Sequence, residues 1–230
     1  MSPTEEDVRA NVVRVLDAVA RAATRAGRDP AGVTLVAAAK GVPAHLVGAA
    51  VEAGVTAVGE NYVQELRAVR EALGDVGVRW HYIGALRSST AHHVADLSDV
   101  VETLGGERAI RRLAGRAARA ARRLDALIEV DFTGARAGVG PDQLPSTADL
   151  AASLEGLRLR GLMTIPPPTP TPEGARAWFR RLRDLRDRLA RTHPGVVDLS
   201  MGMSLDYEVA VEEGATMVRV GTALFGPRTT

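Results

Sequence analysis

The chain has 230 residues, of which 46% are hydrophobic and 25% charged, so it has the composition of a globular protein with a sizeable core. A net charge of +1 gives no general attraction to nucleic acid or anionic membranes, and the absence of cysteine excludes disulfides and thiolate metal sites. With an acidic start and no run of about 18 apolar residues, we expect a cytoplasmic protein that takes a cofactor-sized ligand.

The first predicted element is an N-terminal helix. Ser2 is the expected cap, Pro3 the first helical residue, and Glu5 completes a capping box. Apolar residues recur at helical spacing from Val8 onward, and Gly27 ends the pattern.

Eight short apolar segments then alternate with helical patterns. The predicted strands are 33–39, 57–59, 80–83, 99–104, 127–132, 157–164, 196–199 and 217–220. Helices are predicted at about 44–53, 63–73, 107–122 and 173–191. This order favours an α/β fold: a single (β/α)₈ TIM-type barrel with an extra N-terminal helix, forming one domain over residues 1–230. An open doubly wound sheet is the alternative.

Lys40 is the only lysine among 29 lysines and arginines. An arginine side chain stays protonated and is not an amine nucleophile, whereas a lysine amine can lose its proton and attack an aldehyde. A single leftover surface lysine is the alternative. Lys40 directly follows the first predicted strand, however, and active sites of such barrels lie at the carboxyl ends of the strands. Its position therefore favours a Schiff-base role.

A Schiff-base lysine requires a carbonyl ligand, and pyridoxal 5′-phosphate (PLP) also requires an anion site. The seventh strand ends in the segment Leu199 to Ser204, and the eighth ends in Val218 to Thr222. Small and hydroxyl residues let backbone N–H groups approach a phosphate, and the loops after strands seven and eight are the usual phosphate position in this fold. Together with Lys40, these turns indicate a PLP site.

Several longer segments resemble one family of proteins. They are Leu35–Lys40, Gly59–Glu65, Trp80–Gly84, Arg160–Met163, Leu199–Ser204 and Met217–Thr222, in that order. In these motifs the chain is similar to the YggS/PROSC family of PLP homeostasis proteins, from about residue 4 to 228. The resemblance implies a fold like the barrel domain of alanine racemase, with PLP on Lys40.

The resemblance also implies roles for other residues. Ser200, Gly221 and Thr222 would contact the phosphate, and Arg219 would lie near the pyridine nitrogen. Asn61 and Met163 are further cofactor-binding candidates. Two alternatives come from the residues themselves: Asn61 as a cap of the following helix, and Arg219 as the partner of a carboxylate in the barrel wall.

The chain departs from the family pattern in four places. Ala39 and Gly41 flank Lys40 where serine and a polar residue are usual. The segment Ala85–Ser89 replaces a Pro-Leu-Gln-Ser-Asn sequence, and Glu102–Gly105 replaces a segment of His-Ser type. The loop Thr133–Gly138 is shorter than usual. These departures affect the expected rim of the pocket.

Other candidate residues have simpler interpretations. His81 is either an acid or base near the cofactor or a packed, hydrogen-bonded histidine. His92 and His93 point about 100° apart on a helix and lack a third ligand, so no metal is predicted. The arginine run between Arg108 and Arg123 is interpreted as a solvated helix face rather than a nucleic-acid surface.

The leading hypothesis is a monomeric protein that holds PLP on Lys40 and delivers it in PLP homeostasis, with apo PLP-dependent enzymes as acceptors and little or no turnover. A PLP-dependent amino-acid racemase is the alternative, although such racemases carry a second β-domain that we do not expect beyond Thr230. A Schiff-base aldolase acting on a sugar phosphate is a third possibility.

Overall fold

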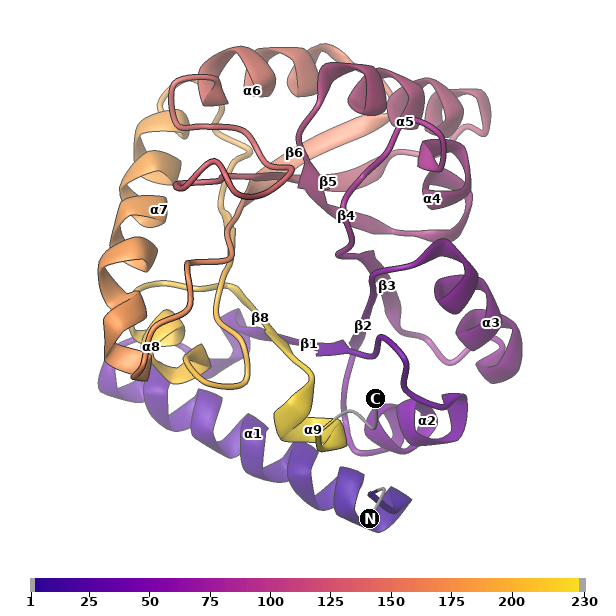
Figure 1. The fold of residues 1–230 in the computed structure, drawn as a ribbon, viewed down its shortest axis with the longest axis vertical. Helices are drawn as coiled ribbons and strands as arrows, with labels where there is room; N and C mark the ends of the chain where they lie inside the picture. Colours follow the sequence, from indigo (N-terminus) through magenta and orange to yellow (C-terminus); the bar gives the residue numbers. More distant parts are fainter. Residues whose placement is uncertain (1–2, 228–230) are drawn as a thin grey trace.

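A computed structural model describes residues 3–227 of the chain. Its eight strands run parallel in the order of the sequence, and the last pairs with the first to close a barrel. Figure 1 shows the strands surrounding the centre of the molecule, with the helices outside them. The predicted (β/α)₈ barrel with an extra N-terminal helix is therefore confirmed, and the open sheet is excluded.

The elements have the following bounds. The strands are β1 (Thr34–Ala38), β2 (Ala57–Glu60), β3 (Arg79–Tyr82), β4 (Val100–Leu104), β5 (Leu124–Glu129), β6 (Leu157–Met163), β7 (Asp198–Ser200) and β8 (Met217–Val220). The α-helices are α1 (Glu5–Arg25), α2 (Ala44–Glu52), α3 (Val63–Leu73), α4 (Ala91–Leu97), α5 (Glu107–Arg119), α6 (Leu144–Ser153), α7 (Arg176–Leu189), α8 (Tyr207–Glu212) and α9 (Thr222–Phe225). Two 3₁₀ turns, η1 (Pro30–Gly32) and η2 (Pro172–Ala175), complete the fold.

The start of α1 differs from the prediction. Thr4 is the cap, because its hydroxyl accepts the N–H of Asp7 at 3.2 Å and its own N–H donates to the Asp7 carboxylate at 2.9 Å. The prediction of a cap at Ser2 is wrong, and Ser2 itself lies outside the described residues. Two overlapping segments fit a capping-box pattern here, and the one that begins at Thr4 puts three acidic residues in the positively polarised first turn.

The start of β5 was also predicted wrongly, three residues too late. Asp125 interrupts the apolar pattern but lies within the strand, where its carboxylate accepts hydrogen bonds from Arg79 of β3 and Arg158 of β6. Burial by itself would raise the pKa of Asp125, but these two arginines outweigh burial and lower it. A paired carboxylate is therefore compatible with a strand interior.

Residues alternate along the strands between the helix layer and the barrel interior. One interior layer is apolar and consists of Val36, Ala57, Val100, Leu127, Met163 and Met217. Two residues further along the strands the interior becomes polar, with Glu102 following Val100 and Arg219 following Met217. The apolar layer thus forms the floor beneath a polar site at the carboxyl ends of the strands.

Helix α1 lies outside the barrel beside α2, α8 and α9, as Figure 1 shows along its lower edge. The Asn11 side chain donates to the carbonyl of Leu224 at 2.8 Å, which joins α1 to α9. The helix therefore covers the part of the barrel where β1 meets β8.

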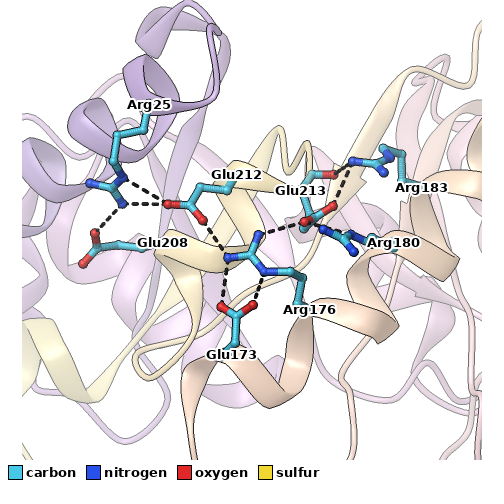
Figure 2. Close-up of polar contacts among 8 residues, drawn as sticks. All are labelled: Arg25, Glu173, Arg176, Arg180, Arg183, Glu208, Glu212 and Glu213. Carbon is cyan, nitrogen blue, oxygen red and sulfur yellow. Dashed lines mark hydrogen bonds and ion pairs between the residues drawn. The ribbon is translucent and has the colours of Figure 1, made fainter.

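A network of eight charged residues connects α1, η2, α7 and α8 (Figure 2). Glu213 lies at its centre: its buried carboxylate accepts hydrogen bonds from Arg176 at 2.8 Å, Arg180 at 3.1 Å and Arg183 at 2.9 Å. Next to it, Glu212 bridges Arg176 and Arg25. Because its members come from four elements, the network fixes the outer helices relative to one another.

Within residues 3–227, none of the helices combines the length and the apolar character that crossing a membrane requires.

Candidate functional site

A cavity of about 670 Å³ opens at the carboxyl ends of the strands. Five of the seven predicted cofactor-binding residues line it: Lys40, Asn61, Arg219, Gly221 and Thr222. They come from the ends of β1, β2 and β8, which are neighbours in the closed barrel. Barrel closure therefore brings together residues from opposite ends of the sequence.

Lys40 lies in a tight turn just after β1. The N–H of Ala39 donates to Gly59 of β2 at 2.9 Å, and the N–H of Val42 donates back to the carbonyl of Ala39 at 2.8 Å. Gly41 has a φ of +70°, a conformation that residues with a side chain rarely adopt. The glycine that departs from the family pattern at position 41 is thus suited to the turn that presents Lys40.

Asn61 is placed by a close approach of two loops. A Cβ atom at Gly84, which follows β3, would lie 1.9 Å from the carbonyl oxygen of Asn61, so only glycine allows this arrangement. The cap of α3 is Tyr62 rather than Asn61, and no side chain caps it. The alternative role of Asn61 as a helix cap is therefore wrong, and its side chain lines the cavity.

The turns after β7 and β8 meet on one side of the cavity. The hydroxyl of Ser204 accepts the N–H of Ala223 at 3.1 Å, which joins the two turns. A Cβ atom at Gly221 would lie 3.0 Å from the carbonyl oxygen of Ala38, so the backbone here packs closely against β1. Ser204, Gly221 and Thr222 thus present hydroxyl and backbone groups to the cavity.

The other two predicted residues do not line the cavity. Met163 belongs to the apolar layer inside the barrel and has no exposed surface. Ser200 is also fully buried, and its hydroxyl donates to Glu102 at 2.5 Å. Both residues therefore lie beneath the cavity, as parts of its support.

Arg219 extends from β8 into the base of the cavity. Its guanidinium donates to the hydroxyl of Ser200 and to the carbonyl of Thr164, the latter at 2.9 Å, and lies 3.5 Å from Glu102. Burial lowers the pKa of Arg219, and the negative charge of Glu102 opposes that effect. Arg219 therefore has a carboxylate partner in the barrel, as one interpretation predicted, while it also lines the cavity.

Glu102 connects Arg219 to His81. His81 Nδ1 lies 2.6 Å from Glu102 Oε1, and both side chains are buried. Burial by itself would raise the pKa of Glu102, but His81 and Arg219 outweigh it and lower the pKa. His81 is thus a packed, hydrogen-bonded histidine, as one of its two interpretations predicted, and the departure at Glu102 supplies the carboxylate that holds it.

The short loop 133–138 forms one rim of the cavity. Asp131 accepts the N–H groups of Thr133 and Arg136, which folds the loop back over β5. A Cβ atom at Gly105 would lie 2.4 Å from the carbonyl oxygen of Ala137, so the glycine of the Glu102–Gly105 departure makes room for this loop.

Sequence reasoning missed three cavity residues that carry chemistry: Glu129, Arg136 and Ser204. Arg136 donates to the Glu129 carboxylate at 2.9 Å. The signal for Glu129 is its place at the carboxyl end of β5, and the signal for Ser204 is the hydroxyl at the end of the quoted Leu199–Ser204 motif. Arg136 has no such signal, because loop folding alone brings it to the rim.

The remaining candidates lie away from the cavity. His92 and His93 stack on each other on α4, and among residues 3–227 no three side chains of the metal-binding types gather closely enough to hold a metal ion. In the arginine run, Arg116 pairs with Asp96 at 2.7 Å, and Arg122 donates to the carbonyls of Ala95 in α4 and Ser98 just after it. These arginines connect α5 to α4.

The cavity combines an amine, a buried guanidinium and a turn of hydroxyl and backbone groups. An amine at the end of a barrel strand can condense with a carbonyl compound, and such a turn suits a phosphate. This chemistry agrees with that of the proteins that the chain resembles. Residues 13–229 match the family described as the alanine racemase N-terminal domain.

Two relatives decide the family. A pyridoxal phosphate homeostasis protein of Aquifex aeolicus is 39% identical over 218 residues, which cover 94% of this chain and 96% of the relative. The protein of the same name from Escherichia coli is 38% identical and covers 96% of this chain and 97% of the relative. The chain belongs to the family of pyridoxal phosphate homeostasis proteins.

Solved structures agree with this assignment. PipY of Synechococcus elongatus, determined with PLP bound, superposes with a TM-score of 0.81 at 33% identity, covering 91% of this chain and all of that one. An alanine racemase of Clostridium difficile superposes with a TM-score of 0.77 at 13% identity, covering 98% of this chain and 58% of the racemase. The second likeness shows a shared fold.

Proposed function

We propose that this family member binds PLP as a Schiff base on Lys40 and acts in PLP homeostasis by holding and releasing the cofactor, with little or no turnover. The observation that carries the proposal is the position of Lys40: the chain's only lysine lines the same cavity as the turns at Ser204 and Gly221. PipY, a relative of the same fold, was determined with PLP bound, which supports the same ligand here.

The residues present fit the cofactor. The cavity volume is within the range of about 300–1,000 Å³ that is usual for small-molecule sites. The Lys40 amine would condense with the PLP aldehyde to form a C=N bond and release one water. Gly221 and Thr222 line the cavity, and because Gly221 has no side chain the backbone there can approach the phosphate. Because Ser200 lies beneath the cavity, we assign the third phosphate contact to Ser204, and Ser200 and Met163 support the site from below.

Arg219 is the basis for expecting little turnover. Bound PLP supplies an electron-withdrawing ring when its pyridine nitrogen is protonated. An arginine side chain only donates hydrogen bonds, so Arg219 facing that nitrogen would keep it unprotonated. The guanidinium is held in the base of the cavity by Ser200, Thr164 and Glu102. The site would therefore retain PLP without activating it strongly.

The decisive experiment is a visible absorption spectrum of the purified protein, followed by borohydride reduction and peptide mass mapping. We expect a yellow protein with the reduced adduct on Lys40. Lys40→Arg is the matched control, because it keeps the positive charge and removes the nucleophilic amine. A colourless protein would favour the aldolase alternative, and a reduced adduct on any side chain of the Lys40→Arg variant would contradict the assignment of Lys40.

We further propose that the protein acts as a monomer and that apo PLP-dependent enzymes accept its cofactor. A size-exclusion experiment with light scattering tests the first point. For the second, PLP-loaded protein is mixed with an apo-enzyme whose activity reports PLP uptake. Transfer faster than the release of PLP into buffer supports direct delivery, and equal rates would contradict it.

A further inference from the structure

Glu60 is an unusual residue for the end of a strand. It is the last residue of β2, its side chain has no exposed surface, and neither carboxyl oxygen has a hydrogen-bond donor among the described residues. Burial, with a contribution from the negative charge of Glu65, raises the pKa of Glu60 to about 8. A pKa raised in this direction favours the neutral carboxylic acid at about pH 7.

A neutral Glu60 would not need a hydrogen-bond donor for each of its carboxyl oxygens, because it carries a hydrogen of its own. Two ionised carboxylates both lack a hydrogen and cannot bond to each other, whereas a neutral acid has one O–H to donate. Glu65, in the first turn of α3, is close enough to Glu60 to raise its pKa. A neutral Glu60 can therefore donate a hydrogen bond, and the Glu65 carboxylate can accept it.

Glu65 in turn contacts the turn that presents Lys40. Its Oε2 accepts the N–H of Gly41 at 3.2 Å. Gly41 follows Lys40 directly and has the left-handed backbone conformation that shapes the turn. Glu65 thus connects the surroundings of the buried Glu60 to the residue beside Lys40, outside the cavity that PLP would occupy.

We propose that Glu60 is a positioning residue for Lys40: as a neutral acid it donates a hydrogen bond to Glu65, and Glu65 holds the N–H of Gly41. The proposal rests on the proposed PLP site at Lys40. It identifies the residues that hold the turn of that lysine from outside the cavity. Ionisation of Glu60 would place two carboxylates in contact at a buried position, and their repulsion would loosen the turn.

Among the groups around Glu60, Glu65 is the one whose charge raises the pKa of Glu60. On one side β1 leads into Lys40, whose amine is used in the Schiff base once PLP binds. On the other side β3 places Tyr82 in register with Glu60, and burial raises the pKa of that phenol, so it stays neutral over the same pH range. The pH response of the turn is therefore set by the Glu60–Glu65 pair.

The test compares the wild-type protein with Glu60→Gln, a variant that remains a neutral donor at every pH. We expect both proteins to bind PLP on Lys40 at about pH 7. Between about pH 7 and pH 9.5 the rate of PLP release from the wild type should rise about tenfold more than that from the variant, since a coupling of one pKa unit corresponds to a factor of ten. Glu71→Gln, an exposed change on the same helix, should behave like the wild type.

A second readout needs no cofactor. The infrared spectrum of the cofactor-free protein at about pH 7 should show the band of a protonated carboxylic acid, absent from Glu60→Gln and present in Glu71→Gln. Equal pH dependence of PLP release in the wild type and Glu60→Gln, or no band assignable to Glu60, would overturn the inference. A wild-type protein that fails to attach PLP to Lys40 at about pH 7 would instead overturn the proposed function.

Discussion

Ser200 donates its hydroxyl hydrogen to Glu102 in the barrel interior, with 2.5 Å between the two oxygens. Both side chains are fully buried, and the same hydroxyl accepts a hydrogen bond from Arg219. The hydroxyl of Ser200 thus holds the Arg219 side chain in place, whereas Ser204 lines the cavity. The two serines of one short segment therefore have separable roles.

We expect Ser204→Ala to weaken the binding of PLP about 10- to 100-fold, since a hydrogen bond to a charged group is worth about 1.5–3 kcal/mol. Binding of pyridoxal, which lacks the phosphate, should change little. Ser200→Ala should instead lower the free energy of unfolding by about 1–3 kcal/mol, because buried partners lose a hydrogen bond. Titration with both ligands and urea unfolding of both variants measure these effects. A phosphate-specific loss in Ser200→Ala would contradict this division of roles.

Gly221→Val should reduce PLP affinity far more than pyridoxal affinity. The branched side chain would press against the carbonyl oxygen of Ala38 and so displace the turn whose N–H groups we assign to the phosphate. Gly32→Val is the control, because nothing lies within 4 Å of a Cβ atom at that position. Equal losses for both ligands in Gly221→Val would show a distorted fold rather than a blocked phosphate site.

Turnover of amino acids should be far below the usual enzyme scale of about 1–10³ s⁻¹. The reason is Arg219, which would leave the pyridine nitrogen unprotonated and the ring a weak electron sink. Incubation of the PLP-loaded protein with L-alanine in heavy water, followed by NMR, measures exchange of the α-proton, and an alanine racemase assayed alongside is the positive control. Rapid exchange would support the racemase alternative.

Glu213→Gln should destabilise the protein at neutral pH, by about 1–3 kcal/mol, because three arginines lose their common carboxylate. Burial by itself would raise the pKa of Glu213, but the hydrogen bonds from Arg176 and Arg180 outweigh it and lower the pKa below that of the unfolded chain. The stabilisation is therefore present above the ordinary glutamate pKa and lost as pH falls through the folded value.

Urea unfolding at about pH 7 and about pH 3 checks this prediction. The difference between the wild type and Glu213→Gln should shrink at the lower pH. Glu173→Gln is the matched control in the same network, since Glu173 is 66% exposed and should matter less (Figure 2). A difference that stays constant with pH would show that packing rather than charge accounts for the effect.

The barrel could be predicted because its strands are short apolar runs with helical patterns between them. The same reasoning tolerated the charges inside β4, β6 and β8 but failed at β5, where a charge interrupts the apolar run near its start. Asp125 led to a late start for β5, and no apolar pattern marked Glu60 and Glu102 as buried carboxylates. Their burial depends on partners far along the chain, such as Arg219 for Glu102, and a sequence pattern does not reveal such partners.

The candidate site was predictable where one residue type is chemically irreplaceable. Lys40 and the glycine at position 221 meet this condition. Ser200 and Ser204 do not, because either hydroxyl suits a phosphate, and only the folded barrel shows that Ser200 is buried in β7 while Ser204 lies in the turn that lines the cavity. Arg136 reaches the rim through a loop whose course depends on Asp131 and on the absence of a side chain at Gly105.

The pairing of β1 with β8 has a consequence for synthesis of the protein. Lys40 and the turn at Gly221 stand far apart in the sequence, and the ribosome releases the first long before the second. Until β8 emerges, β1 has an unpaired edge and α1 lacks the surfaces of α8 and α9. Contacts of this range are slow to form, so we expect the proposed PLP site to form only after the whole barrel has been made.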